Sequence, residues 1–345
     1  MAADILPYAS FWLVCLAILV LPFVPAFREW RHPTDALPLP VLPNYTSDID
    51  HFARRLRADV SSKLGRGAPT GYEDFEMVGD ARPEMDWSKK RQRMISGAIT
   101  TETPIRSPQQ LYVQGSMHAG GGSAFPSLYA TGDIDLGNES EVRDWAHADG
   151  AVKLGEKCVA LRRISAGTRI ELGNQSWFER MQAPTLYFGS RAGRSMPAAH
   201  TRQIPADFAD LPDAVQQTPS LFLVRGNCTL PPGRLYRGSL VVTGFLTIGA
   251  GTTVVGDIKA RDGARLDRQA QVRGALTCEK RIYLFNEARV DGPVISESDL
   301  LIGTGVVVGL VDVQTTVSAA NIIVEEGVVV HGAVWAHEIG MVKPA

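Results

Sequence analysis

The chain has few cysteines, no excess of charge of either sign, and no helical periodicity over most of its length. Only four cysteines occur in 345 residues, Cys15, Cys158, Cys228 and Cys278, and no two of them form a CxxC pair. This spacing gives no support for a zinc or redox site, and so few cysteines in so long a chain do not build a disulfide framework. We therefore expect reduced thiols, with Cys278 as a small core residue.

The charges nearly cancel, with a formal net charge of -2. This balance gives no electrostatic reason to expect nucleic acid as a partner. The glycine run at 119–123, "AGGGS", is not a phosphate loop, because no Lys-Ser/Thr pair follows at the required spacing. Asp133, Asp135 and Glu139 are close in sequence, and we interpret them as a solvated face. The sequence therefore predicts no cofactor and no metal.

Charge is missing altogether from residues 5–27, "ILPYASFWLVCLAILVLPFVPAF". One helix of this length would span about 34 Å, enough for a bilayer core of about 30 Å. No Lys or Arg precedes the stretch and no A-x-A site closes it, so it does not fit a cleaved signal peptide. Residues 1–27 are predicted to be a transmembrane anchor. Arg28 and Arg31 then predict, by the positive-inside bias, that the rest of the chain is cytoplasmic.

Residues 28–107 follow as a spacer with little regular structure. Four prolines between 33 and 43 predict a stiff extended segment. After a plausible Ser47 cap, apolar residues share one helical face; they are Ile49, Phe52, Ala53, Leu56 and Val60. This helix could lie on anionic lipid or pack on the following domain. Residues 65–107 show no period and are predicted to be irregular.

The informative feature is an internal repeat. From residue 222 apolar residues recur every 18 positions, and the next step, of 17, leads to Val311. This core ladder is Phe222, Leu240, Ile258, Leu276 and Val294. A six-residue subdivision runs through it, with Val254, Ala260, Leu266, Val272 and Cys278. The earlier half has the same 18-residue period at Ile134, Val152 and Ile170.

Eighteen residues make one triangular coil of three short strands, because side chains alternate between the two faces of a strand. We therefore predict an all-β fold, a β-helix or solenoid of about twelve coils. Its first part covers 108–189 and its second part 221–338. Residues 190–220 break the period and are interpreted as an insertion with a short helix over 205–214. The two parts could form one continuous β-helix or two independent ones.

The second part, from Leu240 to about Trp335, resembles the bactofilins through the coils "VVGDIKA", "QVRGALT" and "RVDGPVI". Bactofilins are a bacterial polymer-forming cytoskeletal family of compact β-helices. The resemblance implies a non-enzymatic scaffold at the inner membrane. Such a scaffold would associate with itself and with envelope- or polysaccharide-building proteins, and would need no cofactor. With the anchor at residues 1–27, it implies a single-pass inner-membrane protein.

Two other functions remain open. Hexapeptide acyltransferases share the six-residue repeat and use a catalytic histidine as general base. The candidates here, His147, His200 and His331, have no evident carboxylate partner, and we interpret each as a solvent-facing structural residue. No catalytic residue is therefore predicted. The third hypothesis is a monomeric binding module.

The last coil, "GVVVHGAVWAHE" at 327–338, predicts where self-association would occur. Only seven residues follow it, too few for the cap that normally covers a solenoid end. Five residues would be left near an open end, and we predict them as the self-association surface: Val328, Val329, Val330, Val334 and Trp335.

Overall fold

The computed structural model describes residues 5–31, 49–65, 75–78, 85–88, 92–189 and 203–344, and the chain divides into two compact units, Met1–Asp48 and Ile49–Ala345. The first unit contains α1 (Ile5–Val20), η1 (Leu21–Phe23) and α2 (Val24–Arg31).

The single transmembrane helix predicted over 5–27 is not found. The α-helix stops at Val20, and a 3₁₀ turn containing Pro22 follows; proline has no backbone N–H with which to continue an α-helix. At 16 residues α1 is about 24 Å long. None of the described helices is both long enough and apolar enough to cross a membrane.

The second unit is a β-solenoid of about 13 turns, as the 18-residue period predicts. A turn of the second half has three short strands and a turn of the first half has two, and strands of neighbouring turns within a half pair in parallel. The core ladder is confirmed, since Leu240 pairs with Phe222 on one side and with Ile258 on the other. Leu276 likewise lies between Ile258 and Val294.

The first half is built from 12 strands and one helix. In chain order they are α3 (His51–Gly65), β1 (Phe75–Val78), β2 (Gln92–Ser96), β3 (Ile99–Thr101), β4 (Leu111–Gln114), β5 (Met117–Ala119), β6 (Ala124–Ala130), β7 (Ile134–Leu136), β8 (Glu141–Ala148), β9 (Val152–Leu154), β10 (Val159–Ala166), β11 (Arg169–Leu172) and β12 (Trp177–Phe188). The solenoid therefore begins before residue 108, and the prediction of irregular structure over 65–107 was wrong for β1, β2 and β3.

The second half follows residues 190–202 and contains the remaining strands. They are β13 (Ile204–Pro205), η2 (Phe208–Asp210), β14 (Ala214–Thr218), β15 (Leu221–Val224), β16 (Cys228–Leu230), β17 (Arg234–Arg237), β18 (Ser239–Val242), β19 (Phe245–Ile248), β20 (Thr253–Val255), β21 (Ile258–Ala260), β22 (Gly263–Leu266), β23 (Gln271–Val272), β24 (Leu276–Cys278), β25 (Ile282–Leu284), β26 (Arg289–Val290), β27 (Val294–Ser296), β28 (Asp299–Ile302), β29 (Val307–Val308), β30 (Thr315–Glu325) and β31 (Val328–Lys343).

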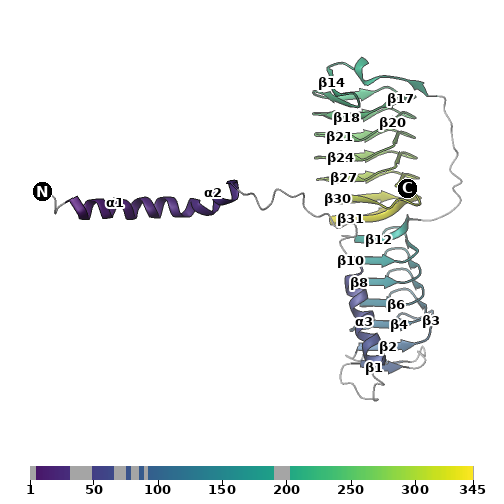
Figure 1. Ribbon diagram of the computed structural model, residues 1–345. Helices are drawn as coiled ribbons and strands as arrows, with labels where there is room; N and C mark the ends of the chain where they lie inside the picture. Colours follow the sequence, from purple (N-terminus) through teal and green to yellow (C-terminus); the bar gives the residue numbers. More distant parts are fainter. Residues whose placement is uncertain are drawn as a thin grey trace. The chain divides into compact units, whose positions relative to one another are not determined.

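The two halves wind toward each other (Figure 1). Coils of the first half progress from β1 to β12, and coils of the second half progress from β14 and β15 to β31. The last strands of the halves, β12 and β31, pair antiparallel. When two solenoids of the same hand progress toward each other, their strands run in opposite directions where they meet. If the two solenoids had opposite hands, the strands at the contact would be parallel. The halves are therefore two solenoids of the same hand joined tail to tail.

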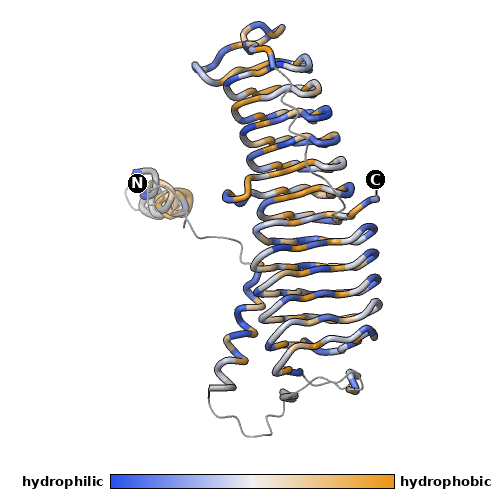
Figure 2. The backbone as a smooth tube through the Cα atoms, turned by 90° about the vertical axis from the view of Figure 1, so that its right-hand side faces the viewer, coloured by the Kyte–Doolittle hydropathy of each residue, from blue (hydrophilic) through white to orange (hydrophobic). Residues whose placement is uncertain are grey.

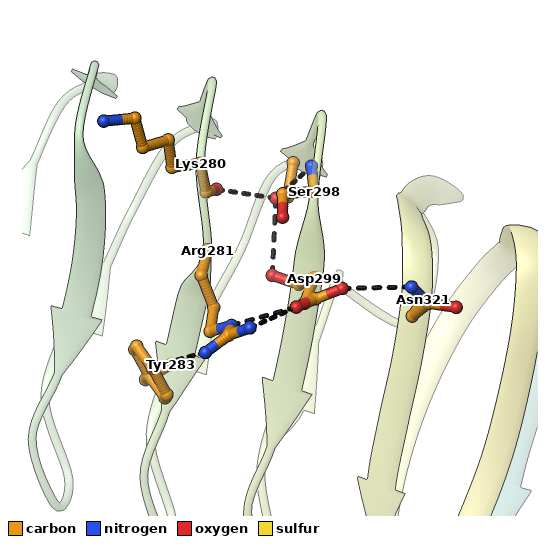
Figure 3. A network of polar contacts seen from close by, with 7 residues as sticks. Lys280, Arg281, Tyr283, Ser298, Asp299 and Asn321 are labelled. Atoms are coloured by element: carbon orange, nitrogen blue, oxygen red, sulfur yellow. Dashed lines mark hydrogen bonds and ion pairs between the residues drawn. The ribbon is translucent and has the colours of Figure 1, made fainter.

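The interior is a narrow column of small and medium apolar side chains, and the tube in Figure 2 shows hydrophobic and hydrophilic residues mixed along every coil. Corners allow close backbone approach: a Cβ added at Gly292 would lie 2.7 Å from the backbone carbon of Gly274. Polar side chains stack outside. Arg281 donates to Asp299 one turn along (3.0 Å), and Asn321 donates to Asp299 from the turn beyond (3.1 Å; Figure 3).

Two further predictions fail where the period is interrupted. The helix expected over 205–214 is replaced by the short turn η2, with strands β13 and β14 on either side of it. The ladder step to Val311 is also wrong, because Val294 pairs instead with Val317. Val311 is 71% exposed in a loop between β29 and β30.

Candidate functional site

The five residues predicted to line an open end lie at the junction between the halves. All five are in β31 and pair with residues of β12. The pairs, with the β12 residue first, are Phe188–Val328, Tyr187–Val329, Leu186–Val330, Met181–Val334 and Arg180–Trp335. Val328, Val330 and Val334 are buried. The prediction of an open end was wrong, because β12, a distant strand of the same chain, pairs with β31 and covers this end.

The junction is packed from both sides. The rings of Phe178 and Phe188 lie 5.5 Å apart in the core, and a Cβ on Gly340 would overlap the ring of Phe178. His331 lies within this junction, with its Nδ1 atom 3.1 Å from the hydroxyl of Thr185. Burial lowers the pKa of His331. His331 is therefore a buried junction residue, and the prediction that it faces solvent was wrong.

Open strand edges occur at the outer ends instead, where each half begins. In the described part of the chain, β14 pairs only with β15, and β1 pairs only with β2. Natural edge strands are usually protected by charge or proline, but β14 reads "AVQQT" and has neither. Its Val215 is 49% exposed. Among the described residues, the free edge of β14 therefore carries no such protection.

One outer face of the first half is covered by α3. Ala53, Leu56 and Val60 of this helix are buried against a second cluster of solenoid residues; those residues are Met94, Tyr112, Tyr129 and Trp145. Tyr112 and Tyr129 stack with their ring centroids 4.9 Å apart. Of the two interpretations of this helix, packing on the following domain is confirmed.

A polar cluster lies beside this aromatic column. The ring of His147 contacts the hydroxyl of Ser165 (2.7 Å) and a carboxylate oxygen of Asp149 (3.3 Å). Tyr129 donates to the same oxygen (2.8 Å), and Arg57 of α3 pairs with the other (3.2 Å). Desolvation lowers the pKa of His147, although Asp149 opposes this effect. The cluster thus links α3 to the solenoid.

The arrangement has the residue types of a nucleophile, base and carboxylate, but its hydroxyl is inaccessible. Ser165 is only 6% exposed, so a substrate carbonyl could not reach it. His147 is also largely buried and has a carboxylate partner, contrary to prediction on both points. His200 lies outside the described residues. The cluster is best explained as the attachment point of α3.

A groove of about 640 Å³ lies where the N-terminal part of α3 meets strands β6, β8, β10 and β12. Its lining residues are Phe52, Ser127, Asp144, Trp145, Arg162, Arg163, Glu179 and Arg180. Arg162 adopts a left-handed backbone conformation (φ 61°) at this corner. The pairing of β10 with β12 shifts register between Ala160 and Arg163, which opens the corner.

Three arginines line this groove, and Arg162 pairs with Asp144 (4.0 Å), whereas Arg163 and Arg180 have no carboxylate partner among the described residues. Arg163 and Arg180 are directly paired across β10 and β12. The Arg163 guanidinium lies 5.0 Å from the ring centroid of Phe52, and that of Arg180 lies 4.0 Å from the ring centroid of Trp335. Burial and the neighbouring charge of Arg163 lower the pKa of Arg180, and Glu179 partly offsets them. The groove therefore concentrates positive charge beside aromatic rings.

The remaining candidates have structural partners. Asp135 pairs with Lys153 (3.3 Å), and Asp133 accepts from a backbone N–H (2.7 Å). Over the residues with assigned positions, no group of three or more His, Cys, Asp or Glu side chains could hold a metal ion. The four cysteines are free, and Cys278 is a buried core residue, as predicted for it. Burial raises the pKa of the Cys228 thiol to about 11, which makes it unreactive.

Part of this site was visible in the sequence. His147 and Asp149 are two residues apart, a spacing that places both on one face of a strand, and Ser165 follows His147 by one 18-residue period. Arg163 and Arg180 are 17 residues apart because of the register shift, so the regular period hides their pairing. No model of a protein family, no curated protein and no solved structure matches this chain. The bactofilin resemblance stays a prediction.

Proposed function

We propose that the protein is a scaffold of bactofilin type, held at a membrane by its N-terminal helices and associating with itself through the outer ends of its solenoid. The observation that carries this proposal is the tail-to-tail junction of β12 and β31. It caps the two inner ends within one chain and leaves the first coils of both halves outermost. The protein would position envelope or polysaccharide machinery along a stiff β-sheet frame.

The end formed by β14 supports association with a second copy. An antiparallel pair of identical strands has twofold symmetry, the commonest symmetry of protein dimers. The junction within the chain shows that coils of this solenoid can join by antiparallel pairing. Because β14 has no charged residue or proline to prevent pairing, we infer that two copies join β14 to β14.

Membrane association is supported by the first unit. Trp12, Leu13 and Ile18 of α1 are each at least 68% exposed. Large apolar side chains gathered on one helix favour an apolar environment. Full-length protein should float with liposomes of mixed anionic and zwitterionic lipid, and Leu13→Glu with Ile18→Glu should reduce the floating fraction. Equal flotation of the two proteins would contradict membrane association through α1. The cytoplasmic orientation stays a prediction.

Self-association is tested by sedimentation velocity of the full chain in detergent. The wild type should form dimers as concentration rises, and Val215→Lys should remain monomeric because it places like charges on both edges. Ile295→Lys is the matched control, since Ile295 is also exposed but lies on β27, whose two edges are both paired. It should dimerise like the wild type. A wild type that stays monomeric at all concentrations would leave the binding-module hypothesis in place of the scaffold.

A further inference from the structure

The groove beside α3 contains two arginines whose placement is unfavourable without a further group. Arg163 and Arg180 are directly opposite each other on neighbouring strands, which lie about 4.8 Å apart. Like charges at such positions repel. Within the described residues, neither guanidinium forms a hydrogen bond or an ion pair with a carboxylate. An anion between them would remove this repulsion.

The contacts that the arginines do form leave their donors available. Each guanidinium stacks on an aromatic ring, Arg163 on Phe52 and Arg180 on Trp335. Stacking uses the flat face of the group and stabilises its orientation. A guanidinium that lies over a ring keeps the N–H donors at its edge available, and these donors can bind a carboxylate or phosphate with two hydrogen bonds.

The other lining residues restrict the kind of anion. Asp144 and Glu179 line the same groove and would repel a ligand with many closely spaced negative charges. Their carboxylates, and the hydroxyl of Ser127, can accept or share hydrogen bonds with sugar hydroxyls. The Phe52 ring offers an apolar surface for the C–H face of a sugar ring. One anionic group together with several hydroxyls fits all of these features.

We propose that this groove binds an acidic saccharide, with Arg163 and Arg180 holding its carboxylate or phosphate and with Asp144, Glu179 and Ser127 contacting its hydroxyls. The groove volume, about 640 Å³, is within the range of small-molecule sites. The site is formed within one chain, by β6, β8, β10, β12 and α3, so it does not require self-association. It gives the scaffold a direct contact with charged polysaccharide.

The test is isothermal titration calorimetry of the full chain in a detergent that contains no sugar. Three probes of similar size are compared: a galacturonic acid trimer, a phosphorylated maltotriose and unmodified maltotriose. We expect dissociation constants of about 1 mM or lower for the acidic probes. The neutral probe should bind at least tenfold more weakly. The stronger of the two acidic probes identifies whether carboxylate or phosphate is the natural group.

Variants locate the site. Arg163→Gln and Arg180→Gln should each weaken acidic binding at least tenfold, since each removes a charge-assisted pair of hydrogen bonds. Arg180→Lys keeps the charge but cannot form two parallel hydrogen bonds to one anionic group. Its affinity for the acidic probes should lie between that of the glutamine variants and that of the wild type. Arg265→Gln is the matched control, because Arg265 also stacks on a ring, that of Phe285, but has its own carboxylate partner, Asp267. Arg265→Gln should bind the acidic probes with the affinity of the wild type.

Several results would overturn the proposal. The first is that neutral and acidic trimers bind equally well. The second is that neither acidic probe binds, and the third is that both glutamine variants keep the affinity of the wild type. Binding of polyglutamate in place of the saccharides would indicate an acidic peptide partner and would also overturn it. Val215→Lys should bind saccharide normally, so failure of this proposal and failure of the self-association proposal are distinguishable.

Discussion

At the scale of the residue, a side chain on a strand of this solenoid has one of two environments, because successive positions face alternately inward and outward. The inward positions form columns in which each residue contacts its equivalent one turn away. Leu276 is fully buried, whereas Lys259, next to the buried Ile258, is exposed. Charged side chains are therefore tolerated at outward-facing positions and excluded from inward-facing ones.

This difference predicts the effect of one substitution at two places. Leu276→Asp would bury a carboxylate without a partner and should lower the free energy of unfolding by roughly 3 to 5 kcal/mol. Lys259→Asp should change it by less than about 0.5 kcal/mol. Thermal unfolding of the full chain, followed by circular dichroism, compares them. Similar melting temperatures for the two variants would show that the assigned register is wrong.

Residue-scale features were predictable where the period is regular. The core ladder from Phe222 to Val294 was found from spacing alone, since stacked coils require equivalent residues at equal intervals. Val311 was misplaced because the extra residues of an exposed loop add no apolar signal of their own. The Arg163–Arg180 pair escaped prediction for a related reason, the register shift between β10 and β12.

At the scale of the element, the decisive contact is between β12 and β31. Antiparallel pairing between residues 177–188 and 328–341 leaves no periodic trace, since it occurs once and joins strands far apart in sequence. The sequence predicted two blocks of coils and correctly left open whether they are continuous. It could not predict that a strand of one block caps the other, so Val328 and its neighbours were taken for an exposed end.

The junction should weaken at acidic pH. Burial lowers the pKa of His331 below its ordinary value of 6.5, so the unfolded chain takes up a proton at higher pH than the folded one. The stability contributed by neutral His331 is complete above pH 6.5 and is lost as pH falls from 6.5 through the folded-state pKa.

The thermal midpoint of wild type should therefore drop by a few degrees more than that of His331→Gln between about pH 7.5 and pH 5. His51→Gln, at an exposed position of α3 outside the junction, is the control and should follow the wild type. Because His147 has a lowered pKa in both proteins, only the difference between them reports on His331. An identical pH profile for wild type and His331→Gln would exclude this role for the junction histidine.

At the scale of the whole molecule, two solenoids of one hand share their inner ends, and their first coils lie toward the outer ends. The contact between the halves shows how coils of this solenoid can join, and β14, an edge strand with no charged residue or proline, lies at an outer end of the described chain. The all-β solenoid was predictable from the repeat. The direction of winding was not, because periodicity is the same whichever way a stack progresses.

The central claim, that copies of the chain join through β14, is tested most directly by disulfide trapping. Single cysteines are introduced at Val215, Gln216 and Gln217 in a Cys15→Ser background, where the remaining cysteines, Cys158, Cys228 and Cys278, are buried. On mild oxidation of the full chain in detergent, at least one of the three should form a covalent dimer rapidly, because a twofold β14 pair brings identical positions together. Ile295→Cys should not. Trapping no faster at β14 than at residue 295 would contradict the account.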